Sequence, residues 1–129
     1  MTEPDAIPWP LVLAIVVTHN GRRWLPGCLK SLALQSYPAL EVVVVDNASE
    51  DRDLVPSLVE RLLPSASVMH FGRNVGFGAA ANRALEVSPD ARRAEYYLFI
   101  HDDVALNQDC VGLLVASALE TIVGPHEPH

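Results

Sequence analysis

The apolar residues of this 129-residue chain alternate between two kinds of spacing, and this alternation constrains its fold more than any other feature. Continuous runs rich in valine and isoleucine, such as residues 11–17, are typical of buried strands that are covered on both faces. Between these runs, apolar residues recur every three or four positions, as they do on one face of a helix. Strands that alternate with helices predict an α/β fold with a mostly parallel sheet and flanking helices.

The same pattern gives the expected order of elements. Strands are predicted at residues 11–17, 41–45, 67–71 and 96–100, with the beginning of a fifth at 121–123. Helices are predicted around residues 25–32, 54–62, 79–86 and 111–119, and the small residues of the third indicate close packing. Pro26 is compatible only with the first turn of its helix, and Ser49 or Asp51 is expected to cap the second helix.

Composition bounds the domain organisation and the kind of partner. Half of the residues are hydrophobic and 19% are charged, which predicts one globular domain over residues 1–124 and a polar tail at 125–129. A net charge of −7 argues against a basic surface, so no nucleic acid is expected as a partner. Cys28 and Cys110 lie in apolar helical patterns and are expected to pack as small hydrophobic side chains.

The apolar runs predict no membrane segment. The run at residues 11–17 is too short to span a bilayer, and it lacks the basic flank of a signal peptide. We therefore expect a cytoplasmic chain without a membrane segment of its own.

Three polar clusters each follow an apolar strand-like run. They are Thr18-His19-Asn20, Asp46-Asn47-Ala48-Ser49 and His101-Asp102-Asp103. In an open α/β sheet the carboxyl ends of the strands form the ligand crevice, so these clusters are expected to converge on one site. Their residue types predict a site for a nucleotide and a metal.

Asp102 and Asp103 are the strongest candidates for binding a metal. Two adjacent carboxylates repel each other unless solvent or a cation intervenes, and oxygen ligands suit Mg²⁺ or Mn²⁺. A solvated turn in which one Asp caps the next helix is the alternative, but the position after a buried strand favours the metal. His101 is a poor ligand for a hard cation, so a positional or hydrogen-bonding role is expected.

Asp46 and Asn47 carry the acceptor and amide groups that recognise the polar edge of a base. Both residue types are also common in turns, which is the alternative. His19 offers either a stacking surface for a ligand ring or an ordinary loop side chain.

Residues 76–81 match the G-x-G-x-x-A fingerprint of dinucleotide-binding domains. In that motif the first glycine directly ends a strand, whereas residues 72–75 intervene here. A glycine-rich loop near a diphosphate remains the expectation. Two alternative functions stay open, namely NAD binding without metal and a non-catalytic interaction domain on the same scaffold.

Together these motifs resemble those of family 2 glycosyltransferases, which are inverting enzymes with the GT-A fold. The resemblance covers residues 11–124 and rests on the order and spacing of five segments. The segments are VVTHNG at 16–21, QSYP at 35–38, VDNASED at 45–51, RNVGFG at 73–78 with Asn82, and FIHDD at 99–103. The third and fourth of these segments, which contain DNAS and NVGFG, are most similar to rhamnosyl- and galactofuranosyltransferase-like members of bacterial cell-envelope assembly.

The resemblance implies a role for each candidate residue. Thr18 and His19 would lie beside a uracil or thymine ring, and Asp46 or Asn47 would bond its imide edge. Asp103 would hold the Mg²⁺ or Mn²⁺ ion that bridges the diphosphate. The residues that would border the nucleotide-sugar pocket are Arg73, Asn74 and Asn82, with Gly76 in the loop near the diphosphate and Asp102 facing the ribose or sugar.

One position departs from the family pattern, because His101 stands where the first aspartate of the D-x-D or D-D-D triplet is usual. The last aspartate is generally the metal ligand, so the donor site is expected to survive. In the family, the carboxylate base that deprotonates the acceptor lies well downstream of this triplet, and Glu120 is too early for it. The resemblance therefore implies a truncated donor domain for a UDP- or dTDP-linked sugar, nearly inactive alone, whose parent enzyme uses a glycan or lipid-linked acceptor.

Overall fold

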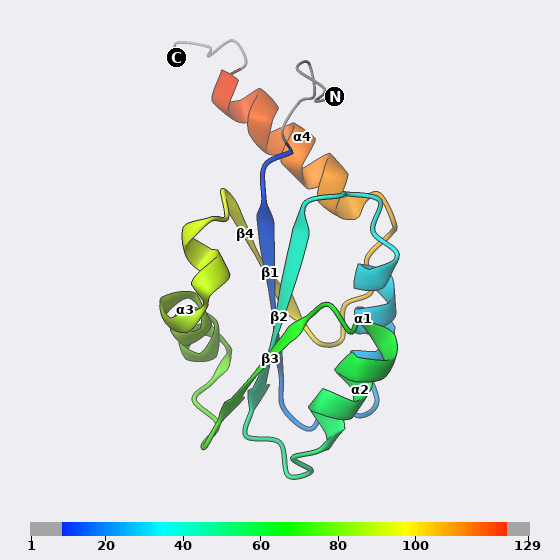
Figure 1. Cartoon of the computed structure of the whole chain (residues 1–129), viewed down its shortest axis with the longest axis vertical. Helices are drawn as coiled ribbons and strands as arrows, with labels where there is room; N and C mark the ends of the chain where they lie inside the picture. Colours follow the sequence, from blue (N-terminus) through cyan, green and yellow to red (C-terminus); the bar gives the residue numbers. More distant parts are fainter. Residues whose placement is uncertain (1–8, 124–129) are drawn as a thin grey trace, which may run out of the picture.

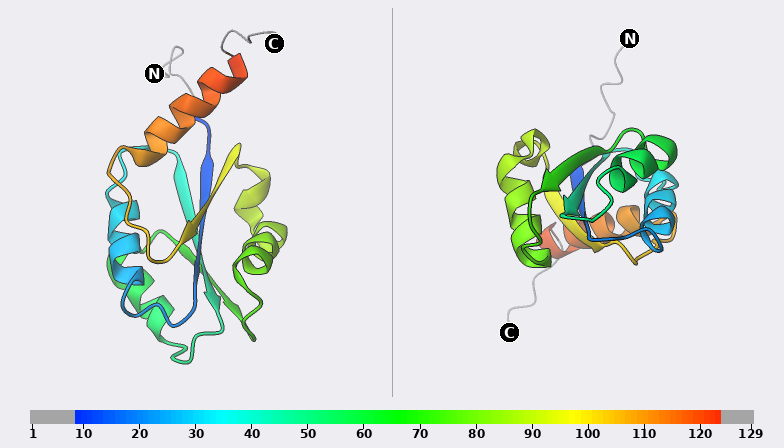
Figure 2. Two further views of the ribbon diagram at one scale, coloured as in Figure 1. Left: turned by 180° about the vertical axis from the view of Figure 1, so that it is seen from behind. Right: turned by 90° about the horizontal axis from the view of Figure 1, so that it is seen from below.

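The computed structural model of the chain describes residues 9–123, which form a parallel sheet with helices on both faces (Figure 1, Figure 2). Within that range the sheet has four strands in the order β3-β2-β1-β4. The strands are β1 (Val12–Thr18), β2 (Leu40–Asn47), β3 (Ser67–Phe71) and β4 (Tyr96–His101). The helices are α1 (Leu25–Ala33), α2 (Leu54–Leu62), α3 (Phe77–Val87), the 3₁₀ helix η1 (Pro89–Arg92) and α4 (Cys110–Val123). The predicted α/β fold is confirmed.

β1 lies in the middle of the sheet and is buried along its whole length. Its side chains alternate between the two layers: Ala14 and Val16 pack in the core with α1 and α2, whereas Leu13, Ile15 and Val17 pack with α3. Figure 2 shows these helices on opposite faces of the sheet. Burial of one large aliphatic side chain contributes roughly 1.5–3 kcal/mol, so β1 is the anchor of both layers.

α3 approaches the sheet closely, as its small residues predict. Ala80, Ala81 and Ala84 are at most 3% exposed and lie in the same core cluster as the β1 and β2 side chains. A helix that presents only methyl groups brings its backbone near the sheet, which leaves little room for larger side chains there.

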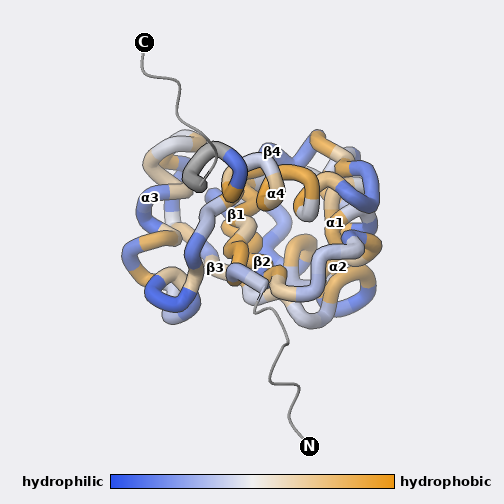
Figure 3. Tube along the Cα trace, turned by 90° about the horizontal axis from the view of Figure 1, so that it is seen from above, coloured by the Kyte–Doolittle hydropathy of each residue, from blue (hydrophilic) through white to orange (hydrophobic). Residues whose placement is uncertain are grey.

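α4 packs against the end of the sheet where β1 begins. Val111 and Val115 are buried beside Val12 and Tyr37. Much of α4 is hydrophobic along its length (Figure 3), and Leu113 and Leu114 are exposed on it. No helix within residues 9–123 is long and apolar enough to cross a membrane.

The fifth strand predicted at residues 121–123 is wrong, because these residues continue α4 to Val123. Thr121, Ile122 and Val123 are β-branched and favour strands by propensity. No Gly or Pro separates them from the helical pattern before them, so the helix simply continues. The tail predicted at 125–129 lies outside the described residues.

The start of α2 also differs from the expectation. The helix begins at Leu54 with Asp53 as its N-cap residue, so neither Ser49 nor Asp51 caps it. Asp51 instead accepts a hydrogen bond from the Asp53 N–H through its side chain, at 3.0 Å, in a turn that precedes the helix. Pro26 lies in the first turn of α1, as predicted.

Cys28 of α1 is buried beneath the end of β4, where its Sγ lies 4.0 Å from the carbonyl oxygen of His101. Burial is the main cause that raises the pKa of this thiol from its ordinary value of 9.0 to about 12, and the nearby negative charges of Asp102 and Asp103 contribute to the same rise. Cys110 is only partly buried. The expected core role is thus confirmed for Cys28 and only in part for Cys110.

The thiol of Cys28 should stay protonated at neutral and mildly alkaline pH. Because thiol reagents attack the thiolate, we expect DTNB at about pH 8 to label Cys110 in the folded chain and Cys28 only after unfolding.

The raised pKa of Cys28 also predicts how stability depends on pH. The thiol of the unfolded chain loses its proton at lower pH than that of the folded chain, so the free energy of unfolding should fall as pH rises from 9 toward 12. A Cys28→Ala variant should lack that fall in denaturant titrations, and equal labelling of both cysteines in the folded chain would contradict the assignment.

Candidate functional site

The three polar clusters predicted from the sequence converge at the carboxyl edge of the sheet. Thr18 pairs with Asp46 across β1 and β2, and Asp46 pairs with His70 across β2 and β3. His101 ends β4 opposite Val17 of β1. Because open parallel sheets bind ligands outside the carboxyl ends of their strands, this edge is the candidate site.

Thr18, the last residue of β1, is directed at the acidic residues after β4. Its Oγ1 donates a hydrogen bond to Oδ2 of Asp102 at 2.7 Å, and the residue is 1% exposed. Thr18 thus lies at the predicted edge, but its hydroxyl is bonded to Asp102 and its buried side chain offers no exposed surface to a ligand ring.

Asp46 is 2% exposed and holds the turn after β2. Its Oδ1 accepts the backbone N–H of Ser49 at 3.0 Å, and its Oδ2 lies 3.2 Å from Nδ1 of His70. Ala48 has a φ of 61° in this turn, a conformation that non-glycine residues seldom adopt. Asp46 therefore stabilises a turn, which was the alternative to base recognition that the sequence left open.

Asn47 ties β2 to the 74–76 loop that precedes α3. Its Nδ2 donates to Oδ1 of Asn74 at 2.9 Å and to the carbonyl oxygen of Gly76 at 3.4 Å, while its Oδ1 accepts the N–H of Val75 at 3.1 Å. Gly76 has a φ of 85° and is the N-cap residue of α3. A backbone with that φ favours glycine, so Gly76 lets the chain turn into the helix.

The loop after β1 is joined to the loop after β2. His19 Nδ1 lies 2.8 Å from the carbonyl oxygen of Asn47, which only accepts hydrogen bonds, so Nδ1 carries the proton. The backbone N–H of Asn20 donates to the Ser49 hydroxyl at 2.9 Å, and Oδ1 of Asn20 accepts the N–H of Glu50 at 2.8 Å. His19 is exposed.

The ring of His101 contacts α3, which is compatible with the positional or hydrogen-bonding role that the sequence predicts. Its imidazole stacks on the ring of Phe77 with centroids 3.9 Å apart and planes 20° apart. This contact joins the end of β4 to the first residue of α3, so the acidic pair and the start of α3 are close neighbours.

Asp102 is half-buried and Asp103 is exposed. No group of three or more His, Cys, Asp or Glu side chains is arranged to hold a metal anywhere in residues 9–123. The two carboxylates are neighbours in the turn after β4. Such a donor set fits a hard divalent ion that takes one or two carboxylates and completes its shell with phosphate oxygens.

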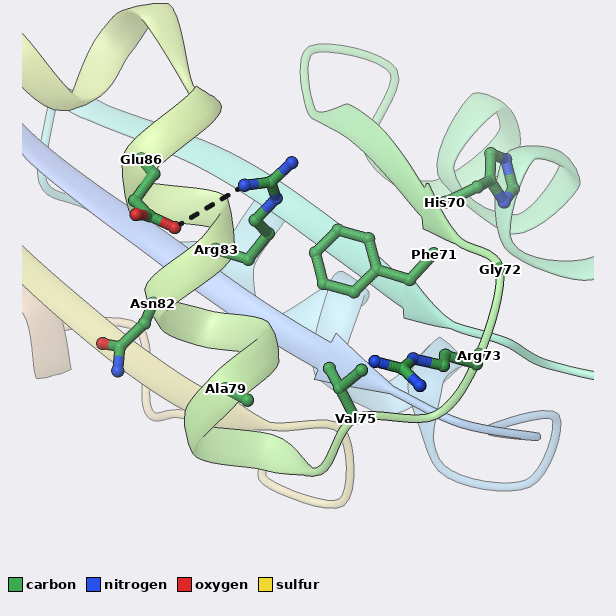
Figure 4. A pocket seen from close by; sticks show the side chains of 9 residues that line it. All are labelled: His70, Phe71, Gly72, Arg73, Val75, Ala79, Asn82, Arg83 and Glu86. Atoms are coloured by element: carbon green, nitrogen blue, oxygen red, sulfur yellow. Dashed lines mark ion pairs between the residues drawn. The ribbon is translucent and has the colours of Figure 1, made fainter.

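A cavity of about 610 Å³ lies between β3 and α3, next to the 74–76 loop (Figure 4). Two of the predicted site residues, Arg73 and Asn82, line it together with Phe71. In Figure 4 the Arg73 side chain extends toward Val75, whereas Asn82 points away from Arg73. Asn74 and Gly76 do not line this cavity but contact Asn47, so the loop after β3 carries predicted site residues on both the cavity and the β2 side.

Sequence reasoning missed several residues of this edge. His70 was part of an expected strand, and only the β2–β3 register brings it to Asp46. Phe77 lies within the glycine-rich motif, but nothing in the local sequence pattern indicates that its ring contacts His101. Gly21 lies directly over the Thr18–Asp102 hydrogen bond, and its place in the THNG segment was the available clue.

Comparisons with known proteins agree on one family. The family model described as Glycosyl transferase family 2 matches residues 13–124. A PGL/p-HBAD biosynthesis glycosyltransferase of Mycobacterium bovis is 30% identical over 125 residues, which are 92% of this chain and 44% of that protein. The crystal structure of S. aureus TarS 1-349 in complex with UDP matches with a TM-score of 0.71 and 26% identity, over 92% of this chain and 38% of that one.

A similar match is found with the mannosyltransferase PcManGT from Pyrobaculum calidifontis in complex with GDP-Man and Mn²⁺. Its TM-score is 0.71 at 29% identity, over 90% of this chain and 33% of that one. This chain therefore spans less than half the length of each of these three proteins. Their names mention neither rhamnosyl nor galactofuranosyl transfer, so that narrower resemblance stays a prediction.

The family match runs along the whole sheet and includes all three polar clusters. It favours a glycosyltransferase over both alternatives, the dinucleotide-binding domain and the non-catalytic interaction domain. This chain belongs to glycosyl transferase family 2, of which it represents the N-terminal part of the GT-A fold.

Proposed function

We propose that this chain binds a UDP- or dTDP-linked sugar at the carboxyl edge of its sheet and presents it for inverting transfer. The observation that carries the proposal is the meeting of Asn47, the start of α3 and the Asp102-Asp103 pair at one edge. They supply an amide for a base, backbone N–H groups for a diphosphate and carboxylates for a divalent ion. The similar chains solved with UDP, and with GDP-Man and Mn²⁺, support it.

Asn47 is the better of the two candidates for binding the base. Both oxygens of Asp46 are engaged by its own turn and by His70, so a ligand would have to displace the Ser49 N–H or the His70 ring to bind them. Asn47 is also buried, at 3% exposed, but its partners belong to the exposed 74–76 loop, so a ligand would reach its amide by displacing that loop. The exposed ring of His19, held next to Asn47, offers a stacking surface for a uracil or thymine.

The start of α3 is the proposed site of the diphosphate. The first N–H groups of a helix have no partners within the helix, and the helix dipole favours negative charge there. Gly76 precedes these groups with a φ of 85°, and Asn74 and the exposed Arg73 lie in the same loop. Arg73 adds the positive charge that a diphosphate requires.

Asp103 is the proposed ligand of Mg²⁺ or Mn²⁺, because it is the exposed member of the acidic pair. When bound, the ion would neutralise charge on the departing nucleoside diphosphate. Asp102 adds negative charge beside it, and the ring contact of His101 with Phe77 keeps the pair close to the start of α3.

The acceptor and the catalytic base are not assigned to residues of this chain. We propose a glycan or lipid-linked acceptor on the cytoplasmic side of a bacterial envelope. Inversion requires a carboxylate that deprotonates the acceptor hydroxyl. Because the chain spans 44% or less of the compared proteins, we expect it to bind the donor without transferring the sugar on its own.

Replacement of Asp103 tests the metal assignment. In calorimetric titrations with UDP, Asp103→Ala should abolish the gain in affinity that Mn²⁺ gives to the unsubstituted chain, because loss of a direct ligand costs more than the roughly 10- to 100-fold lost with an outer-shell partner. Glu120→Ala, which removes the same charge from an exposed position of α4, is the matched control and should keep that gain. Mn²⁺-dependent UDP binding by Asp103→Ala would refute the assignment.

Replacement of Asn47 tests base recognition separately. Asn47→Ala removes one or two hydrogen bonds to the base and should weaken UDP binding about tenfold, while the ratio of affinities with and without Mn²⁺ stays the same. Asn107→Ala, an exposed asparagine of the loop after β4, is the control and should bind UDP normally. Unchanged UDP affinity in Asn47→Ala, or loss of the Mn²⁺ effect, would contradict the role.

A further inference from the structure

We infer that Thr18 is a positioning residue for the acidic pair: its buried hydroxyl fixes Asp102 and thereby the direction in which Asp103 leaves the sheet. This inference rests on the proposed donor site and assigns Thr18 a different task from contact with a base. Its basis is the geometry at the ends of β1 and β4.

The pairing of β1 with β4 brings the two residues together across 84 positions of sequence. Val17 is opposite His101, so the next residue of each strand, Thr18 and Asp102, continues past the paired region side by side. A carboxylate only accepts hydrogen bonds, so the Thr18 Oγ1–H is the donor in the 2.7 Å contact with Oδ2.

Gly21 covers this hydrogen bond. A Cβ at position 21 would lie 2.1 Å from Thr18 Oγ1 and 2.6 Å from Asp102 Oδ2, so glycine is required there. The carbonyl oxygen of Gly21 accepts the N–H groups of Trp24 and Leu25 at 3.0 and 2.8 Å, which fixes it to the start of α1. The Thr18 end of the contact is thus buried while Asp102 is half-buried, and a hydrogen bond to a charged group is stronger than one between neutral groups.

The turn that carries Asp103 is held at two points. The N–H of Val104 donates to the carbonyl oxygen of His101 at 3.2 Å and closes the turn, and the Thr18 hydroxyl holds the Asp102 side chain within it. Asp103 is the exposed residue between these two ties. Since Thr18 is 1% exposed and its proton is already donated, a base could reach it only by breaking the tie to Asp102.

Thr18→Val keeps the shape of the side chain and removes the hydroxyl. We expect it to weaken Mn²⁺-dependent UDP binding about tenfold, as loss of a partner that orients a metal ligand does. Binding of uridine, which has no phosphates and reports the base site alone, should not change when followed by NMR titration. Thr18→Ser, which restores the hydroxyl, should recover most of the Mn²⁺-dependent affinity.

Ser88→Ala is the matched control. Its hydroxyl is also buried but has no hydrogen-bond partner among the described residues, so its removal should alter neither the UDP nor the uridine titration.

A double substitution tests whether Thr18 acts through Asp102. In a chain that carries Asp102→Asn, adding Thr18→Val should reduce the Mn²⁺-dependent affinity for UDP clearly less than Thr18→Val does alone, because the two residues act as one unit. Thr18→Ala removes the same hydroxyl without adding a methyl group beside Asp102, and it should repeat the pattern if Thr18→Val does not fold.

Unchanged Mn²⁺-dependent UDP binding in folded Thr18→Val or Thr18→Ala would overturn the inference while leaving the proposed function intact. An equal loss of uridine and UDP binding would overturn it as well and would make Thr18 a base contact. Failure of the unsubstituted chain to bind UDP with Mn²⁺ would instead refute the proposed function, and the inference with it.

Discussion

The complete burial of β1 is the constraint on which the rest of the structure depends. This strand has neighbours on both edges and a helical layer on each face, so a shift of register by one residue would turn Leu13 and Ile15 into the wrong layer. Because β2 and β4 are aligned against β1, Thr18, Asp46 and His101 lie within one register position of each other at the same edge of the sheet. The place of the candidate site thus follows from the apolar pattern of one strand.

Most of the fold could be predicted because buried parallel strands leave a plain signal in the sequence. Residues 41–45, for example, are almost continuous valine, as a strand covered on both faces requires. The same β-branched signal failed at 121–123, where three residues cannot outweigh the helix that they continue. The cap of α2 was also unpredictable, because it depends on a turn in which Asp51 accepts the Asp53 N–H.

The location of the candidate site could be predicted, but the directions of its side chains could not. Spacing indicates which residues end a strand, and contacts between residues far apart in sequence depend on register. The polar groups of Asp46 and Asn47 are therefore engaged with His70 and the 74–76 loop, which spacing does not reveal. The polar side chains at this edge are held by hydrogen bonds to one another, and a ligand must replace some of these bonds with its own. The 74–76 loop is the exposed part of that network, so it offers the easiest exchange.

The most direct test of this account is calorimetric titration of the 129-residue chain with UDP and dTDP, each with and without Mn²⁺, and with NAD as a control. The account predicts that at least one of the two pyrimidine diphosphates binds in a Mn²⁺-dependent manner and that NAD does not bind. Metal-independent binding of NAD, or no binding of either pyrimidine diphosphate to the folded chain, would contradict it.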